Sequence, residues 1–321
     1  VYDAFGNLQQ VTTTTPDSSG TPSVLVRDLA TSSTTNRLEG PLFTYDPRGT
    51  FAVEHAYVQY YVPEARNTAP PVLMVHGGGM HGGTWETTPD GRPGWLHLLL
   101  QRGFEVHVID NVERGRAGFL PGLWESEPIT RSLEEAWSLF RIGPAGGHAT
   151  HTAHPNQQFP FSHFTAFARQ FVPRWLDTTP LHVSAVCAVL ERIGPALVCC
   201  HSQGGEIVFD AHAFVPELMA AIIAVEPSVT RCDVDGMRKT PLVLVAGDHL
   251  DADLQIAKRS AGWRNTVVDL VCAGGTAMYL DTALSVARGG SHMLMMDHHN
   301  EACLDGALSA LSACGVSRAV S

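Results

Sequence analysis

Ser202 is the side chain in this sequence best placed to act as a nucleophile. It follows an apolar run, 196–200, that indicates a buried strand, and it precedes a helical pattern in which Gly204 and Gly205 permit close packing against the strand. A serine on such a sharp strand-to-helix turn projects its hydroxyl beside the first N–H groups of the helix, where an oxyanion can be bound. Serine is also a common helix N-cap, and Cys200 stands where the G-x-S-x-G pattern has its first glycine. This stretch alone supports nucleophile and cap about equally.

A glycine-rich segment upstream is the expected companion of a nucleophilic serine. His76-Gly77-Gly78-Gly79 directly follows the apolar run 71–75. Glycines let the backbone approach a substrate carbonyl closely and leave N–H groups free to donate to it. An ordinary glycine-rich turn is the alternative, but this loop ahead of a serine turn is the usual pairing for an oxyanion hole. We expect Gly78 or Gly79 to supply one N–H donor and Gln203 to supply the other.

A serine nucleophile needs a general base, and the chain order serine, acid, histidine places that base near the C-terminus. His292 lies in a predicted loop before a terminal helix, with His298 and His299 close by. The apolar run 293–296 can bury one side of a ring at His292, whereas 297–300 is polar. His292 is therefore the preferred base.

Two carboxylates compete to orient that histidine. Glu226 ends the predicted strand 220–225 and is followed by Pro227, whereas Asp248 ends the next strand, 242–245. A generic hydrolase layout favours Asp248. Glu226 follows a buried run without a local Lys or Arg partner, so it is less easily explained as a surface charge. The residues alone leave both candidates open.

Composition limits the partners. The 321 residues carry a formal net charge of −11, which argues against a nucleic-acid partner and favours a small neutral or weakly charged ligand. No apolar run approaches the roughly 20 residues that span a bilayer. The sequence begins without Met, so a removed secretion signal, with a secreted or periplasmic location, is one hypothesis, and a cytoplasmic location is the other. A homodimer is a further hypothesis.

Neither a metal nor another cofactor is expected. The seven cysteines are too sparse for a disulfide scaffold and lack C-x-x-C zinc spacing. His148, His151 and His154 have a spacing that suits a metal on a helix, but flanking Gly and Pro residues disfavour a helix there. Four tryptophans are candidates for an aromatic substrate pocket, with core packing as the default: Trp85, Trp95, Trp124 and Trp175.

Short apolar runs alternate with helix-length segments along most of the chain. This alternation predicts an α/β fold with a mostly parallel sheet covered by helices on both faces. The predicted strands are 51–62 at an edge, 71–75, 104–109, 196–200, 220–225, 242–245 and 277–280, and the predicted helices are 95–102, 181–193, 203–213 and 252–259.

Two segments break this alternation. Residues 1–40 are rich in Thr, Ser, Pro and Gly, which predicts an N-terminal arm with one short strand. Residues 115–180 form a long insertion with Pro, Gly, His and aromatic residues, which predicts a folded cap over the strand ends. The predicted organisation is thus an arm, 1–40, and one domain, 41–321, that carries the cap.

The motifs together resemble the α/β-hydrolase superfamily over roughly residues 40–315. Within it they resemble a small group of secreted microbial esterases with a Ser-Glu-His triad. The resemblance implies Ser202 as nucleophile, Glu226 as acid and His292 as base. The matching segments are 76–77, 84–92, 108–110, 114–116, 158–160, 201–203, 225–227, 247–249 and 291–293.

The chain departs from that group in its oxyanion loop. The group can carry two adjacent cysteines there, where this chain has Gly78-Gly79. The chain's own adjacent pair, Cys199-Cys200, precedes the nucleophile, so no redox feature of the loop carries over.

The expected activity is hydrolysis of a small-molecule carboxylic ester through an acyl-enzyme intermediate. An acyltransferase or lactonase built on the same triad is the alternative enzyme class. A hydrolase fold that only binds a small molecule is the alternative outside catalysis.

Overall fold

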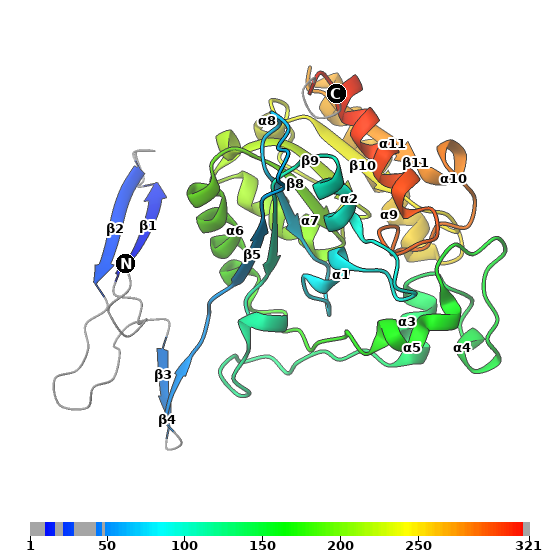
Figure 1. The fold of residues 1–321 in the computed structure, drawn as a ribbon, viewed down its shortest axis with the longest axis horizontal. Helices are drawn as coiled ribbons and strands as arrows, with labels where there is room; N and C mark the ends of the chain where they lie inside the picture. The colour runs from blue at the N-terminus through cyan, green and yellow to red at the C-terminus, as the bar shows by residue number, and fades with distance from the viewer. Residues whose placement is uncertain (1–9, 17–21, 29–42, 47–48, 317–321) are drawn as a thin grey trace.

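A seven-stranded sheet forms the centre of the molecule (Figure 1). The computed structural model describes residues 10–16, 22–28, 43–46 and 49–316. The strand order is β11-β10-β9-β8-β6-β7-β5, and every neighbouring pair is parallel except β5 with β7. The strands are β5 Tyr57–Tyr61, β6 Val72–Val75, β7 Val106–Asp110, β8 Ala196–His201, β9 Met219–Val225, β10 Leu242–Ala246 and β11 Ala277–Asp281.

Helices cover both faces of this sheet, which explains why its central strands are apolar throughout. Alternate side chains point to opposite faces: Met74 and Cys199 pack with α2 (Trp95–Gln101) and α11 (Asn300–Ala313). Val75 and Cys200 pack on the other side with α6 (Thr179–Ile193) and α7 (Gln203–His212). The α/β-hydrolase architecture expected from the sequence is therefore confirmed.

The remaining helices are short except for one. α9 (Leu254–Cys272) packs along β10 and β11 and buries Trp263 against Leu244 and Ala246. The others are α1 Gly83–Glu86, α8 Val234–Met237, α10 Thr282–Ser285 and the 3-10 turns η1 Gly115–Ala117 and η3 Pro216–Leu218. Among the described residues, no helix is both long enough and apolar enough to cross a membrane.

Parts of the predicted element pattern were wrong in detail. The expected strand 51–62 is two strands: β4 (Gly49–Ala52) pairs with β3 (Phe43–Asp46), and β5 joins the main sheet. Glu54 lies between them with φ 57°, which interrupts an extended chain.

The N-terminal arm contains more regular structure than expected. Its described residues form two antiparallel strands, β1 (Gln10–Pro16) and β2 (Pro22–Asp28), where one short strand was predicted. Much of the predicted arm, 1–40, lies outside the described residues, so its boundary with the domain 41–321 stays a prediction.

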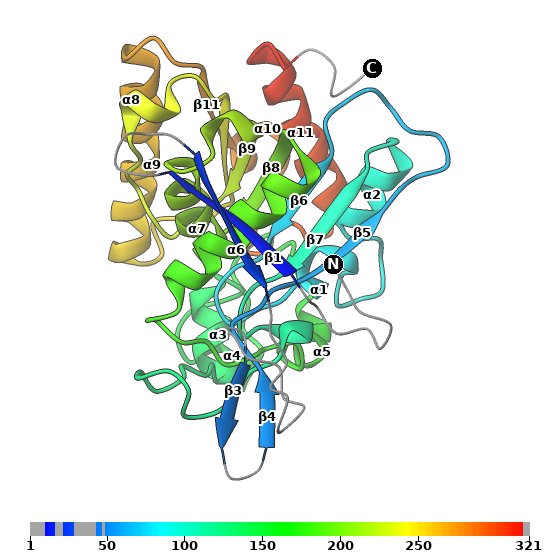
Figure 2. The same cartoon turned by 90° about the vertical axis from the view of Figure 1, so that its left-hand side faces the viewer.

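The predicted cap segment, 115–180, folds into short helices between β7 and α6. They are α3 Leu133–Leu139, α4 Gly147–Thr150, η2 Phe161–His163 and α5 Phe164–Ala168. In both overall views α3, α4 and α5 gather at one end of the sheet (Figure 2). Phe140, Phe159, Phe164 and Phe167 from this segment join the hydrophobic core under it. The segment is thus anchored by apolar burial and not only by its two ends.

Candidate active site

Ser202 lies on a strained turn between β8 and α7. Its backbone has φ 52° and ψ −117°, a conformation that non-glycine residues rarely adopt. Two hydrogen bonds hold it there: Ser202 N–H donates to the Val225 carbonyl at 3.0 Å, and Ser228 N–H donates to the Ser202 carbonyl at 2.9 Å. Both bonds join the turn to β9 and the residues just after it.

The two glycines after Ser202 allow the helix to start this close to the sheet. A Cβ at position 204 would lie 2.6 Å from the Val75 carbonyl oxygen, and one at position 205 would overlap Pro227. Any larger residue at either position would therefore push α7 away from β6 or β9.

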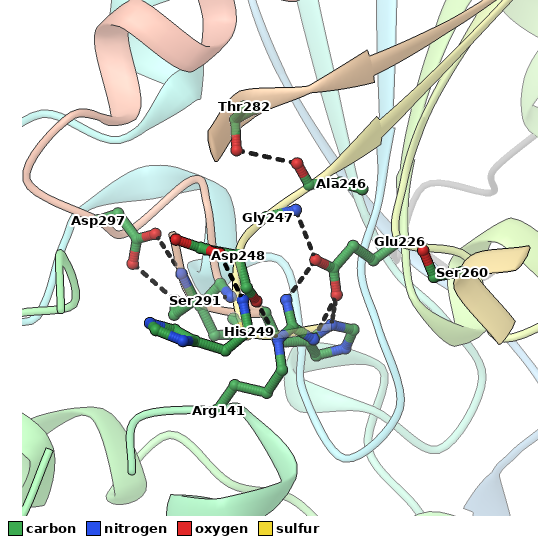
Figure 3. Close-up of polar contacts among 12 residues, drawn as sticks. Arg141, Glu226, Ala246, Gly247, Asp248, His249, Ser260, Thr282, Ser291 and Asp297 are labelled. Atoms are coloured by element: carbon green, nitrogen blue, oxygen red, sulfur yellow. Dashed lines mark hydrogen bonds and ion pairs between the residues drawn. The ribbon is translucent and has the colours of Figure 1, made fainter. Parts of the chain in front are cut away.

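Glu226 and His292 form a buried pair at the same edge of the sheet. Nδ1 of His292 lies 2.6 Å from Oε2 of Glu226. Gly247 N–H donates to Glu226 Oε1 at 2.8 Å, and Arg141 donates through both Nη1 and Nη2 to the two carboxylate oxygens (Figure 3). The Glu226 side chain is inaccessible to solvent, so each oxygen must find its partners within the protein.

The charges around this pair hold it in the form that a general base requires. Burial alone would raise the pKa of Glu226, but Arg141 and His292 outweigh it and hold that pKa well below its usual range. Burial lowers the pKa of His292, and the hydrogen bond that the imidazole makes to the Glu226 carboxylate only partly opposes this effect. At neutral pH the pair is therefore a carboxylate beside a neutral imidazole.

The ring of His292 is fixed from three directions. The ring stacks on Phe140 with ring centroids 5.8 Å apart and an angle of 9° between planes, and the backbone N–H of His292 donates to the Phe140 carbonyl at 3.0 Å. Its own carbonyl lies 3.0 Å from Nε2 of His201. The preceding residue, Ser291, donates through its hydroxyl to Asp297 at 2.6 Å. These contacts set the position of the imidazole before any substrate binds.

Asp248, the competing acid, faces a different part of the molecule. Its carboxylate accepts from Gly289 N–H at 2.8 Å and from His249 N–H at 2.8 Å, and it pairs with Arg288 at 3.0 Å. Its backbone carbonyl accepts from Nε of Arg141 at 2.8 Å. Asp248 thus shapes the loop before His292, whereas Glu226 is the carboxylate that contacts the imidazole.

The glycine loop after β6 lies against the Ser202 turn. A Cβ at Gly77 would lie 3.1 Å from the Ser202 Cβ, and one at Gly78 would lie 2.8 Å from Oε1 of Gln203. Gly79, with φ 70°, turns toward the cap segment, where its carbonyl accepts from Val172 N–H at 3.0 Å. Of the two glycines expected to donate to an oxyanion, Gly78 is therefore the one beside Gln203.

The contact between nucleophile and base stays a prediction. Among the described residues, the Ser202 hydroxyl makes no hydrogen bond. His201, which precedes it, lies against His292 with ring centroids 4.6 Å apart. Catalytic hydrogen bonds are often long without substrate and shorten when it binds, so an unbonded hydroxyl at Ser202 is compatible with a nucleophile.

The histidine series of the cap does not converge on one point. His148 and His151 pack against Trp137, whereas His154 stacks on His249 with centroids 4.6 Å apart. Within the described ranges, no group of three or more His, Cys, Asp or Glu side chains is arranged to hold a metal ion. The short helix α4 does form, although the sequence disfavoured a helix there.

The tryptophans divide between core and cap. Trp85 and Trp95 are fully buried in the main core, with centroids 5.8 Å apart, so the default interpretation holds for them. Trp124 and Trp175 pack against each other within the cap segment, with ring centroids 4.9 Å apart.

The seven cysteines are all free thiols.

Sequence analysis missed the two cap residues that complete the site, Arg141 and Phe140. Both lie between predicted elements, and their contacts with Glu226 and His292 span 85 residues or more. In the sequence, the only sign that Arg141 is buried is its position between two apolar residues, Phe140 and Ile142.

Arg141→Met is expected to destabilise the protein by about 3–5 kcal/mol, because it leaves the buried Glu226 carboxylate without its cation. Urea unfolding of this variant and of Arg169→Met, which removes an exposed arginine of the same segment, measures the difference. A loss below about 1 kcal/mol, like that of most surface substitutions, contradicts the assigned role of Arg141.

Comparisons with known proteins agree with this architecture. No family model matches the chain. It is 29% identical over 248 residues to the probable secreted lipase phiG of Fungal sp. (strain ATCC 74256), covering 74% of this chain and 62% of that protein, so it spans less than two thirds of that relative. A solved structure of a novel bacterial esterase superposes with a TM-score of 0.76 at 29% identity, covering 87% of this chain and 92% of that one. The chain is thus an α/β-hydrolase superfamily member that resembles a bacterial esterase and a probable secreted lipase.

Proposed function

We propose that this protein is a serine hydrolase of carboxylic esters, with Ser202 as nucleophile, His292 as general base and Glu226 as the acid that orients the base. The observation that carries the proposal is the buried His292–Glu226 pair, 2.6 Å apart, at the sheet edge where Ser202 occupies a strained turn. The likeness to a bacterial esterase and to a probable secreted lipase supports ester substrates.

In the proposed reaction, the Ser202 oxygen attacks the ester carbonyl while Nε2 of His292 takes the hydroxyl proton. Backbone N–H groups of Gly78 and Gln203 then stabilise the oxyanion of the tetrahedral intermediate. His292 returns the proton to the departing alcohol, which leaves an acyl group on Ser202. A water molecule, activated by the same histidine, releases the acid and restores the serine.

Glu226 acts through His292 in this scheme. By accepting from Nδ1–H it selects the tautomer with a free Nε2, and its negative charge stabilises the imidazolium formed during each step. Arg141 and Gly247 hold the carboxylate toward the imidazole. The carboxylate itself stays ionised because its pKa lies well below the usual range.

The acyl products formed from 4-nitrophenyl butyrate, butyric acid or methyl butyrate, with and without added methanol, test the reaction class. A hydrolase releases mainly butyric acid, whereas an acyltransferase passes the acyl group to methanol in preference to water. A lactone substrate in the same assay tests the lactonase alternative. Tight retention of the ester without turnover would support a binding protein and contradict the proposal.

The rate should depend on pH through His292. Because burial lowers the pKa of this imidazole from 6.5, kcat/KM is expected to rise with pH and to reach half its plateau below pH 6.5. A pH profile of kcat/KM with a neutral ester measures this midpoint. An acid limb centred above pH 7 contradicts a base whose charged form is disfavoured by burial.

The same likeness supports the hypothesis that the protein acts outside the cytoplasm, since the fungal relative is described as secreted. Assay of ester hydrolysis in the culture medium and in the cell lysate of the producing organism tests this directly. Activity confined to the lysate contradicts it.

A further inference from the structure

Arg174 of the cap segment lies over the glycine loop beside Ser202. Backbone bonds in both directions with Ile129, at 2.7 and 3.0 Å, fix its position. A Cβ at position 78 would overlap Nη1 of Arg174, so the glycine there leaves room for the guanidinium. The same Nη1 lies 3.4 Å from Oε1 of Gln203, the residue after the nucleophile.

Among the described residues, the Arg174 guanidinium lacks a carboxylate partner. Neighbouring arginines have one: Arg114 pairs with Glu113 at 3.0 Å, Arg131 pairs with Glu135, and Arg141 pairs with Glu226. Within the described part of the chain, no acid lies within 4 Å of the Arg174 guanidinium. Its Nε is buried without a hydrogen-bond partner, although the side chain as a whole is half-buried.

A half-buried guanidinium without a carboxylate partner, lying over the glycine loop that contacts Ser202, is suited to hold an anion of the substrate through its terminal N–H groups. A guanidinium binds carboxylates through two parallel N–H donors, and where it is half-buried, as Arg174 is, water screens its charge only in part. The net charge of −11 means that the protein as a whole repels anions. The positive charge of Arg174 locally opposes this repulsion.

We propose that Arg174 is a specificity-determining residue that binds a carboxylate carried by the ester substrate, so that the preferred substrates are esters bearing a second, anionic group. This inference rests on the proposed ester hydrolysis at Ser202. The carboxylate belongs either to the acyl part, as in half-esters of dicarboxylic acids, or to the alcohol part.

Two pairs of matched esters test the proposal. Mono-4-nitrophenyl glutarate and 4-nitrophenyl pentanoate differ by a carboxylate on the acyl side, and 4-acetoxybenzoate and phenyl acetate differ by one on the alcohol side. The measured quantity is the ratio of kcat/KM for the anionic ester to kcat/KM for the neutral ester, after subtraction of spontaneous hydrolysis. We expect Arg174→Gln to lower this ratio by about 10- to 100-fold in one pair, the effect of losing a hydrogen-bonded charge.

Arg169→Gln is the control, since it removes an exposed cation of the same segment and should leave both ratios unchanged. Arg174→Lys should retain part of the preference, and the wild-type preference should weaken with added salt. If Arg174→Gln does not fold, the preference of Arg174→Lys and the salt dependence of wild type still test whether Arg174 binds the carboxylate.

The proposal is overturned if Arg174→Gln leaves both ratios unchanged, or if it slows anionic and neutral esters equally, which is the result for a residue that only positions Gln203. Hydrolysis of the neutral esters by wild type in those cases shows that the proposed reaction stands while the carboxylate site does not. If wild type hydrolyses none of the four esters, the proposed reaction fails and the inference fails with it.

Discussion

Ser202→Ala is expected to lower kcat for ester hydrolysis by about 10⁴- to 10⁶-fold, since the covalent route needs the serine oxygen and the remaining groups have no nucleophile to activate. Binding of the ester should be little changed, because the oxyanion donors are backbone groups of the glycine loop and α7. The measurement is the steady-state rate with 4-nitrophenyl butyrate at neutral pH. A variant that keeps more than a tenth of the wild-type kcat would show that Ser202 is not the nucleophile.

The Ser202→Ala variant should also fold normally, which makes the kinetic result interpretable. Alanine keeps the Cβ, so the backbone strain at φ 52° is the same in both proteins. Within residues 49–316 no group loses a hydrogen-bond partner when the hydroxyl is removed. Thermal unfolding of the two proteins side by side checks this expectation.

Glu226→Gln is expected to lower kcat by about 10³- to 10⁴-fold. An amide can donate to His292 and so favour the tautomer whose Nε2 carries the proton, and it cannot stabilise an imidazolium. It also leaves the buried Arg141 without its carboxylate. The measurement is kcat on a neutral ester for this variant and for Asp248→Asn.

Asp248→Asn is the matched comparison because it removes one carboxylate charge from the next strand end. Its partners are Gly289, His249 and Arg288, so the expected loss of activity is less than about tenfold, through looser packing of the loop before His292. An inactive Asp248→Asn beside a nearly normal Glu226→Gln would assign the acid to the wrong strand.

The sequence predicts the central sheet well because burial leaves a local signal. Strands covered on both faces must be apolar throughout, and the runs that end at Val75, Cys200 and Val225 show this pattern directly. The segment 51–62 lacks such a signal, since it is only half-buried and carries a single turn residue, Glu54, that interrupts it.

Helix α9 shows why a local pattern can mislead about length. The predicted helix ended at 259, but α9 continues to Cys272 through Gly262, a residue that weakens a helix in isolation. In the structure a Cβ at position 262 would lie 2.6 Å from Cβ of Thr230, so glycine permits close packing there. Only the tertiary contact reveals that reason.

In the candidate site too, residues in short sequence motifs could be predicted, whereas residues whose roles depend on long-range contacts could not. Ser202, the glycine loop and His292 belong to short motifs and can be proposed from the sequence. Arg141 and Arg174 belong to the cap, whose short helices lack a regular pattern, and their roles depend on contacts with residues far away in the chain. The residues alone left Glu226 and Asp248 open, the family resemblance favoured Glu226, and the contact between Glu226 and His292 supports that prediction.

The central claim, that Ser202 is an activated nucleophile, is tested most directly by reaction with a fluorophosphonate followed by mass spectrometry of the labelled peptides. The account predicts one adduct per chain on Ser202, absent in Ser202→Ala and formed much more slowly in Glu226→Gln. An unlabelled protein that still hydrolyses esters, or an adduct on another residue with Ser202 unmodified, would contradict it.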